Sequence, residues 1–375
     1  MSVDGKGHYG IGAPAIPYDK NKPTYLRITD INDDGTINFL DLKSVDDEDS
    51  NKYLLKENDI VFARTGNSTG RSYFYQKEHG DFVYAGFLIK FSIDPQKVNP
   101  KILKYYTHSQ EYYNWVKSFD TGGTRGNINA KTFGDMPISL PKRCVQDKIV
   151  GILSALDAKI ENNNKINANL ESQAQALFKS WFVDFTPFKD QPFVDSELGP
   201  IPQGWKVGKL GDICTFKRGK NLLSKNAIDE GVPVVAGGLT PSCYHNQANT
   251  SAPVVTVSGS GANAGFMRMY HVDVWASDCS FIDVSCDYLY FVYCFLSVNR
   301  RLLKHAQTGA VQPHVKPADI HDFDVVIPEE DIVKAFQNII KELLTKVGVN
   351  EKENQRLAAL RDTLLPKLMS GEIKL

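Results

Sequence analysis

The chain has 375 residues, of which 42% are hydrophobic and 11% aromatic, and its formal net charge at pH 7 is −1. This length suits two domains, the composition excludes an intrinsically disordered chain, and the charge balance argues against a protein that coats nucleic acid without regard to sequence. No apolar run approaches the roughly 20 residues of a membrane helix, and the six cysteines contain no C-x-x-C pair, so we expect a cytoplasmic protein without a disulfide framework or zinc module.

Short alternating runs such as DIVFAR and FLIKFSI predict several strands in residues 1–141, a region rich in Gly, Thr, Val, Tyr and Phe. A Gly-rich, hairpin-like loop, ARTGNSTGRSYFY, follows one of these strands at 63–75. A helix-like stretch, KILKYYTHSQEYYNWVKSF, comes next at 101–119. The region therefore indicates an α+β domain with substantial strand content.

The stretch TGGTRGNINAKTFGDMPISLP at 121–141 recurs 187 residues later as TGAVQPHVKPADIHDFDVVIP at 308–328. Both copies open on Thr-Gly, and each precedes a helical pattern in which one position repeats every seven residues. This heptad pattern predicts a coiled-coil seam on two long helices. The seam residues of the first helix are Ile149, Leu156, Asn163, Leu170 and Leu177, and those of the second are Phe336, Leu343, Asn350, Leu357 and Leu364.

A second apolar stripe matches across the same offset, so we expect the two helices to pack against each other. A buried amide costs stability unless a polar group satisfies it. We therefore expect Asn163 and Asn350 to face each other and to fix register and partner number, with surface exposure as the alternative. At roughly 1.5 Å per residue, residues 145–181 would span about 55 Å. The second stripe pairs Val145 with Ile332, Ile152 with Ile339, Leu153 with Ile340, Ile160 with Val347 and Trp181 with Leu368.

The same order of parts returns in the second half of the chain. Residues 200–328 contain the runs PVVTVS and DVWAS, a second Gly-rich loop, VSGSGANAGFMRMY at 257–270, and a second helix-like stretch at 289–306. The predicted fold class is therefore α+β, with two globular domains related by an internal repeat and joined by two long antiparallel coiled-coil helices. We place the first domain at 1–141, the first helix at 142–185, the linker and second domain at 186–327, and the second helix with the C-terminal tail at 328–375.

Common catalytic motifs are missing from the sequence. No G-x-x-x-x-G-K-S/T loop is present to cradle a triphosphate, and no Asn or Asp followed by Pro-Pro and an aromatic residue is present to hold a target amine. GSGANAG at 259–265 only loosely resembles a dinucleotide fingerprint, because the sequence after it predicts a strand and not a helix. The eight histidines lack metal-ligand spacing, and Ser258 and Ser260 lack a G-x-S-x-G elbow. These absences favour a binding protein; an enzyme with an unrecognised active site is the alternative.

Three further stretches carry a resemblance to a known family: LFKSWFVDFTPF at 177–188, ELGPIPQGWKVGKLGDI at 197–213 and LLPKLMSGEIKL at 364–375. Together with the tandem repeat, they closely resemble the specificity (S) subunit of type I restriction-modification systems over essentially the whole chain. The resemblance implies two target-recognition domains, each reading one half of a split DNA site, with two antiparallel helices as a spacer. A rod of about 55 Å matches about 16 base pairs, so we expect half-site centres about one to one and a half turns apart.

The resemblance also implies partners: double-stranded DNA, two modification (M) subunits, and restriction (R) subunits. It assigns the chemistry to those partners, because the M subunits bind S-adenosylmethionine, flip an adenine out of the stack and methylate it. This chain is thus expected to be non-catalytic and to hold no cofactor of its own. The helical pair is the expected docking surface for M. A silent or recombination-exchanged cassette is an alternative within the family, and a coiled-coil adaptor without a DNA role is another.

Candidate DNA contacts are mainly polar residues in the Gly-rich loops and the Thr-Gly elements, because Arg reads guanine, Asn and Gln read adenine, and Lys, Arg and hydroxyls bind phosphate. The alternatives are a structural turn for the Thr-Gly elements and a solvated loop for the basic cluster at 217–220. Tyr73, Phe74 and Tyr75 are expected to be strand core and not a stacking platform. The candidates are Arg64, Thr65, Asn67, Ser68, Arg71, Thr124, Arg125, Asn127, Lys131, Arg218, Lys220, Ser258, Ser260, Asn263, Arg268, Gln312, His314 and Lys316.

The first domain departs from the pattern of the second. The second opens with PIPQGWKVGKLGDICTFKRGK at 200–220, whereas the first begins near the counterpart of the later part, with GHYGIGAPAIPYDKNKPTYLRITDI at 7–31 and no GWK segment before it. Either the first domain obtains this strand elsewhere, for example from the C-terminal GEIKL at 371–375, or the start of the gene is shortened.

Overall fold

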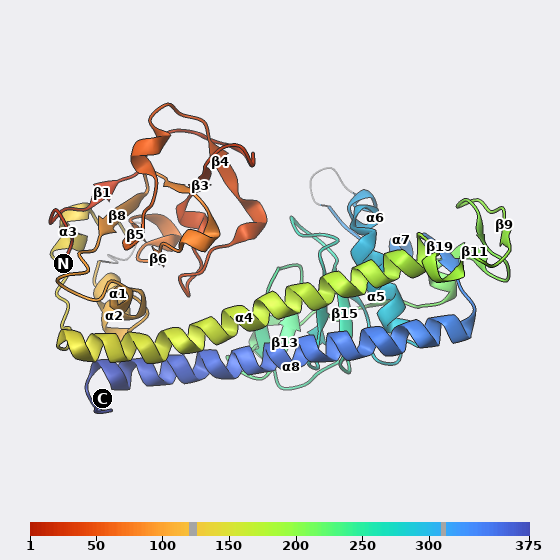
Figure 1. The fold of residues 1–375 in the computed structure, drawn as a ribbon. Helices are drawn as coiled ribbons and strands as arrows, with labels where there is room; N and C mark the ends of the chain where they lie inside the picture. The colour runs from red at the N-terminus through yellow and green to blue at the C-terminus, as the bar shows by residue number, and fades with distance from the viewer. Residues whose placement is uncertain (120–125, 309–312) are drawn as a thin grey trace. The chain divides into compact units, whose positions relative to one another are not determined.

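The computed structural model describes residues 1–119, 126–308 and 313–375, and the chain divides into two compact units (Figure 1). Unit 1 holds residues 1–160 and 356–375, and unit 2 holds residues 161–355. Each unit contains one domain of mixed strands and helices together with part of each long helix. The predicted fold class of two α+β domains with two long helices is confirmed.

Domain 1, within unit 1, is built on two four-stranded sheets with the orders β1-β8-β5-β6 and β2-β4-β3-β7. Neighbouring strands are antiparallel except β3 and β7, which run parallel. The strands are β1 (His8–Tyr9), β2 (Ala15–Pro17), β3 (Thr24–Leu26), β4 (Lys43–Val45), β5 (Asp59–Ala63), β6 (Ser72–Phe74), β7 (Phe82–Tyr84) and β8 (Leu88–Ser92).

The central strand β5 is buried on both faces because successive side chains of a strand point to opposite sides. Ile60 and Phe62 pack into a cluster with the helices of unit 1, whereas Val61 and Ala63 pack into a second cluster against the other sheet. The three aromatic residues 73–75 are buried, so their predicted role as strand core is confirmed.

Three short helices of domain 1 cover the sheet that contains β5. Side-chain oxygens cap two of them: Ser109 accepts a hydrogen bond from the Tyr112 amide, and Asn129 accepts one from the Thr132 amide. The helices are α1 (Lys101–Tyr106), α2 (Gln110–Lys117) and α3 (Ala130–Gly134), and the 3-10 turns are η1 (Ile28–Asp30), η2 (Phe39–Asp41), η3 (Ser50–Tyr53), η4 (Gly66–Ser68) and η5 (Lys77–His79).

Domain 2, within unit 2, repeats this architecture. Its main sheet has the order β12-β18-β15-β16, which matches β1-β8-β5-β6, and its second sheet, β14-β13-β17, again contains one parallel pair. The elements are β12 (Lys217–Arg218), β13 (Val232–Val235), β14 (Cys243–His245), β15 (Val254–Ser258), β16 (Met267–Tyr270), β17 (Trp275–Ala276), β18 (Cys279–Ile282), α5 (Leu289–Val298), α6 (Arg300–His305), α7 (Pro317–His321), η6 (Thr186–Phe188), η7 (Leu210–Asp212) and η8 (Ser224–Asn226).

Domain 2 also has two small antiparallel sheets at its entry and exit. The segment with the GWK sequence forms β11 (Lys206–Lys209), which pairs with β19 (Asp324–Ile327) at the exit of the domain. Before it, β9 (Phe193–Val194) pairs with β10 (Ile201–Pro202). The exit of domain 2 is therefore sealed by its own entry segment.

Domain 1 has a different exit. The counterpart of β19 lies 187 residues earlier, at 137–140, and these described residues form no strand. Residues 371–375 form no strand either, so the expectation that GEIKL supplies the missing strand is wrong. The tail still contributes, because Ile373 packs on the hydrophobic cluster of unit 1.

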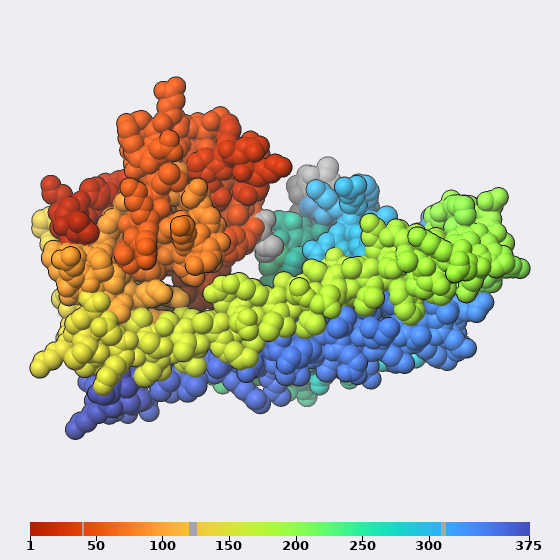
Figure 2. Space-filling model, viewed as in Figure 1, coloured from red at the N-terminus to blue at the C-terminus, as the bar shows by residue number. Residues whose placement is uncertain are grey.

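The two long helices, α4 (Arg143–Phe182) and α8 (Glu330–Met369), contain 40 residues each and begin 187 residues apart. Within each unit their parts run antiparallel and in contact (Figures 1 and 2). In unit 1, Arg361 contacts Asp157 at 3.0 Å, and in unit 2 the rings of Phe178 and Phe336 meet at 5.9 Å. The predicted antiparallel packing is confirmed. No helix in the described residues is long and apolar enough to cross a membrane.

The seam between these helices combines apolar and amide side chains. Ile149, Phe336, Asn163 and Asn350 are buried, whereas the seam leucines 156, 170, 177, 343, 357 and 364 are half-buried. We expected the two asparagines to face each other, but each has a different partner. The amide nitrogen of Asn163 donates to Glu353 at 2.7 Å and to Asn354 at 2.9 Å, and that of Asn350 donates to Asn167 at 2.8 Å. The second stripe is wrong at Ile152 and Ile339, which are exposed.

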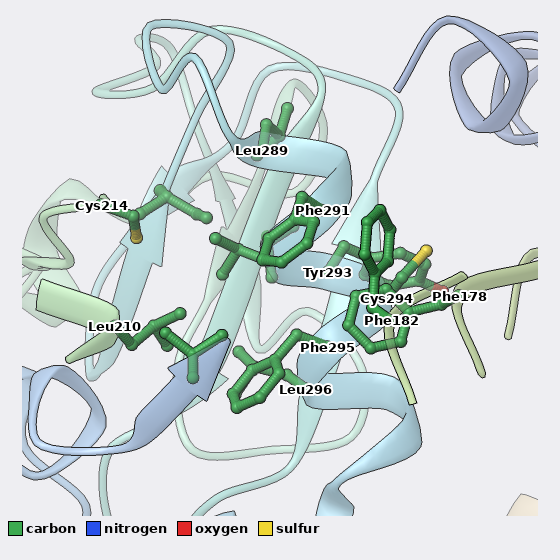
Figure 3. Packing of buried hydrophobic residues seen from close by; sticks show 14 of the residues in the cluster. Phe178, Phe182, Leu210, Cys214, Leu289, Phe291, Tyr293, Cys294, Phe295 and Leu296 are labelled. Carbon is green, nitrogen blue, oxygen red and sulfur yellow. The ribbon is translucent and has the colours of Figure 1, made fainter. Parts of the chain in front are cut away.

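An aromatic cluster joins α4 to domain 2 within unit 2. Phe182 lies 5.1 Å from Phe291 of α5 and 4.8 Å from Phe336 of α8, measured between ring centroids. Figure 3 shows Phe178 and Phe182 among the side chains of α5. Because buried aromatic rings contribute large contact areas, the helix and the domain share one core.

Candidate nucleic-acid interface

The same loop follows the central strand in both domains. It is closed by the Gly70 amide donating to the Ala63 carbonyl at 2.9 Å in domain 1, and by the Gly265 amide donating to the Ser258 carbonyl at 2.9 Å in domain 2. Two glycines in each loop have positive φ, at 77° and 88° in the first and 80° and 78° in the second. Left-handed backbone favours glycine, which explains why both sequences are Gly-rich here.

Each loop lies beside the described part of its Thr-Gly element. The Ile128 amide donates to the Arg64 carbonyl at 2.9 Å, and the Val315 amide donates to the Gly259 carbonyl at 3.1 Å. Single β-bridges join Thr65 to Asn127 and Ser260 to His314. The structure thus brings together, in each domain, candidates from segments more than 50 residues apart in the sequence. Thr124, Arg125 and Gln312 lie outside the described residues.

The loop of domain 1 begins with a guanidinium that rests on an aromatic ring. The Arg64 guanidinium carbon lies 5.0 Å from the centroid of the Tyr9 ring, a cation–π arrangement. The Arg64 Nε is buried and has no hydrogen-bond partner among the described residues. The Arg64 amide donates to the carbonyl of Phe87, whose side chain is 59% exposed. One cation and two exposed aromatic rings therefore share this corner of domain 1.

The corresponding corner of domain 2 is charged. Arg218 in β12 forms an ion pair with Asp278, and the Ser260 hydroxyl donates to the same carboxylate. Gly259 opens the loop, and a Cβ added there would collide with the Arg218 guanidinium. Glycine therefore makes room for the arginine.

The family model for the type I restriction modification DNA specificity domain matches this chain twice, at residues 16–172 and 202–361. The chain belongs to this family. Among curated relatives, the Type I restriction enzyme MjaIX specificity subunit of Methanocaldococcus jannaschii is 29% identical over 296 residues, which cover 72% of this chain and 68% of the relative. The Type I restriction enzyme HindI specificity subunit of Haemophilus influenzae is 24% identical over 407 residues, covering 86% of this chain and 88% of the relative.

One solved structure has the same fold as this chain. The crystal structure of the type I restriction-modification system S subunit from M. genitalium matches with a TM-score of 0.53 and 19% sequence identity, covering 98% of this chain and 95% of that chain. The two matches to the specificity-domain family coincide with the internal repeat seen in the sheets, so we call the two domains recognition domains 1 and 2.

The other candidates of recognition domain 1 differ in availability. Asn67 and Asn127 are exposed, whereas Ser68 is buried. The Arg71 Nε donates to Asp33 at 2.7 Å, and Lys131 pairs with Asp135 at 2.8 Å, so both cations already have acidic partners. An acidic partner reduces the net charge that a cation offers to a phosphate.

In recognition domain 2, Lys220 and Lys316 are exposed, and the side-chain amide of Asn263 donates to the Gly237 carbonyl at 3.3 Å. The prediction of a loop position is wrong for Ser258 and Arg268, which lie in β15 and β16. Ser258 is only 3% exposed. It offers little surface for a direct DNA contact.

Arg268 faces the long helices instead of an open loop. Its guanidinium lies 3.7 Å from the carboxylate of Glu351 in α8 and 5.0 Å from the centroid of the Tyr270 ring. Burial raises the pKa of Glu351, and the nearby Arg268 partly offsets that rise. Arg268 therefore has a structural partner within unit 2.

Sequence analysis missed three members of the two corners: Tyr9, Phe87 and Asp278. A signal was present, because His-Tyr-Gly at 8–10 and Lys-Arg-Gly at 217–219 both end on a glycine, and each glycine lies against backbone carbonyls at the end of a strand of the second sheet, β7 or β17. Aligning those two glycines in the sequence would have identified Tyr9 as the counterpart of Arg218. Among the described residues, no group of three His, Cys, Asp or Glu side chains is arranged to hold a metal ion.

Proposed function

We propose that this chain is the DNA specificity subunit of a type I restriction-modification complex, and that its two recognition domains read the two halves of a split DNA target. The observation that carries the proposal is the double match to the specificity-domain family together with one loop built twice on different side chains. Equal frameworks with unequal side chains suit two half-sites of unequal sequence, since base edges are read by side chains while backbone amides contact phosphate.

The resemblance extends this proposal to partners. Two modification subunits supply S-adenosylmethionine-dependent methylation of an adenine flipped out of the duplex, and restriction subunits supply cleavage. This chain contributes recognition and no chemistry, and it acts in the cytoplasm, where the DNA lies. The pair of α4 and α8 offers exposed apolar side chains, Ile152 and Ile339 among them, to the modification subunits.

Mapping modified adenines tests the proposal directly. The chain is produced together with its modification subunits in cells that lack other methyltransferases, and methylated positions are read by sequencing. We expect one recurrent motif with two specified halves and an unspecified gap. The proposal fails if no motif emerges, or if the purified chain alone methylates or cuts DNA.

The spacer part of the proposal has its own test. The unit boundary crosses α4 between residues 160 and 161 and crosses α8 between 355 and 356. Inserting seven residues at both positions keeps the heptad pattern and adds about 10 Å of helix. We expect the unspecified gap to lengthen by about three base pairs at roughly 3.4 Å each. An unchanged gap would exclude helix length as the determinant of spacing.

A further inference from the structure

Each recognition domain holds one guanidinium at the corner where the central strand enters its loop: Arg64 in domain 1 and Arg218 in domain 2. We infer that these two arginines contact base edges at equivalent positions of the two half-sites, and that the side chains around them, Tyr9 with Phe87 and Asp278 with Ser260, determine whether one base or both bases of the pair are read. The inference rests on the proposed function and goes beyond it by naming the residues that set specificity.

Backbone hydrogen bonds establish which residues are equivalent. The Arg64 amide donates to the Phe87 carbonyl at 3.0 Å, and the Gly259 amide donates to the Asp278 carbonyl at 3.0 Å. Positions 64 and 259 are thus counterparts, and so are positions 87 and 278.

The neighbouring edge strand gives the third pair of positions. Tyr9 is opposite Ile89 in the pairing of β1 with β8, and Arg218 is opposite Ser280 in the pairing of β12 with β18. Ile89 is in turn opposite Phe62 of β5, and Ser280 is opposite Val257 of β15. Tyr9 and Arg218 therefore occupy the same place on the two sheets.

The strand that supplies the arginine differs between the domains, and so does the strand that supplies the residue packed against it. In domain 1 the guanidinium comes from the end of β5 and lies over a ring supplied by β1. In domain 2 it comes from β12 and lies against Gly259, the counterpart of Arg64. Because Gly259 has no side chain, the Arg218 guanidinium occupies the space that a Cβ would fill. Each domain consequently has a guanidinium at the equivalent corner, but a different strand supplies the arginine in each.

The surroundings give the two guanidinium groups different chemistry. Arg64 is half-buried, its guanidinium lies over the Tyr9 ring, and it forms no ion pair among the described residues, so the two Nη groups of its fork can meet the O6 and N7 atoms of guanine. Arg218 is paired with Asp278, whose carboxylate also accepts the Ser260 hydroxyl. A carboxylate accepts a hydrogen bond from an amino group, as in cytosine N4. The corner of domain 2 therefore combines a donor fork with an acceptor and suits a guanine–cytosine pair read across both bases.

Single substitutions in the full complex with modification subunits test this inference. Affinity is measured for the mapped target and for every single-base variant of it. We expect R64A and R64K each to lose about 10- to 100-fold discrimination at one position of one half-site, because lysine cannot form the bidentate contact. D278N should reduce base discrimination at one position of the other half-site, and R218A should reduce it at the same position.

A transplant sharpens the test. The triple variant R218Y, G259R and D278F rebuilds the corner of domain 1 inside domain 2, and it should make the discrimination at that position match the discrimination measured at the Arg64 half-site. K225A, which removes an exposed charge from η8 of domain 2, is the matched control and should leave discrimination unchanged. Melting curves of each variant report whether it is folded, and R64K retains the charge and most of the packing.

The outcomes separate the inference from the proposed function. A wild-type complex without any recurrent motif removes the proposed function itself. A wild-type motif combined with variants that weaken all sequences equally would make the arginines phosphate contacts and overturn the inference. Variants with unchanged discrimination overturn it as well.

Discussion

The two recognition domains share sheets, loops and helices, yet they close their exits differently. In domain 2 the entry strand β11 covers β19, and Leu210 follows it with a side chain that is fully buried. In domain 1 no strand among the described residues lies beside the corresponding residues 137–140, and Ile138 is half-buried. A duplicated core can therefore keep its central sheet while one copy lacks an edge that the other has.

A cavity marks the difference in domain 1. It has a volume of about 240 Å³ and is lined mainly by apolar side chains, including Phe62, Phe133, Met136 and Ile138. Met136 is the counterpart of Phe323, whose carbonyl accepts the Leu210 amide at 2.8 Å in domain 2. The cavity thus lies where the segment that carries Leu210 packs in the other copy.

The largest expected effect comes from breaking the sealed exit. Leu210→Ala removes a fully buried side chain and should cost about 4 kcal/mol of the unfolding free energy of unit 2, because the lost transfer energy and the new cavity both count. Domain 1 has no counterpart of Leu210, so the comparison there is Ile138→Ala at the exit segment, which should cost about 1 kcal/mol because that side chain already borders open space. Hydrogen exchange resolved by segment measures the two units separately. Equal losses in both units would contradict the proposed difference.

Histidine 271 gives the next effect, which depends on pH. Burial, helped by Arg268, lowers the pKa of His271 to about 4, whereas an unfolded histidine has a pKa near 6.5. The folded state therefore favours the neutral form of His271. The stability that this group contributes is fully present above about pH 6.5 and is lost as the pH drops toward 4, by about 3 kcal/mol in all.

The counterpart of His271 in domain 1 is Gln76, two residues beyond Phe74, the last β6 partner of β5, so His271→Gln copies domain 1 into domain 2. The variant should lose most of this acid sensitivity in unit 2, measured by urea unfolding between pH 7 and pH 4. Burial raises the pKa of Glu171 and Glu351, whose protonation opposes the loss in both proteins, so the difference between variant and wild type isolates the histidine. Parallel curves for the two proteins would refute the assignment.

The contrast between the domains also shows what sequence can predict. Local patterns predict helices and turns without knowledge of the tertiary fold. Examples are the seven-residue spacing that includes Ile149 and Phe336 and the glycine pairs of the two loops. The meeting of Arg64 with Tyr9 depends on strand order and register, which join residues 55 positions apart. The asparagine partners depend on a shift of about one helical turn between helices, which a heptad pattern alone leaves open.

A third test fills the gap in domain 1. Placing a copy of residues 200–214 before Met1 supplies a strand for 137–140 and a leucine for the cavity, and it should stabilise unit 1 by about 2 kcal/mol, the value of burying one leucine. The same copy carrying the equivalent of Leu210→Asp is the control and should add nothing. Protection from exchange at 136–140 would show where the copy binds. A gain that is identical with the aspartate control would mean that the added segment acts elsewhere.

The smallest expected effect on stability comes from a surface lysine that only domain 1 possesses. Lys131 of α3 is exposed and paired with Asp135, and its counterpart in α7 is Ala318. Because exposed ion pairs contribute little, Lys131→Ala should leave the melting temperature unchanged. If Lys131 contacts phosphate, DNA affinity should fall uniformly across target sequences and the slope of log affinity against log salt should decrease by about one. The reciprocal Ala318→Lys should raise that slope in domain 2. A change in base preference in either variant would place this position among the base-reading residues instead, next to the corner that Arg64 occupies.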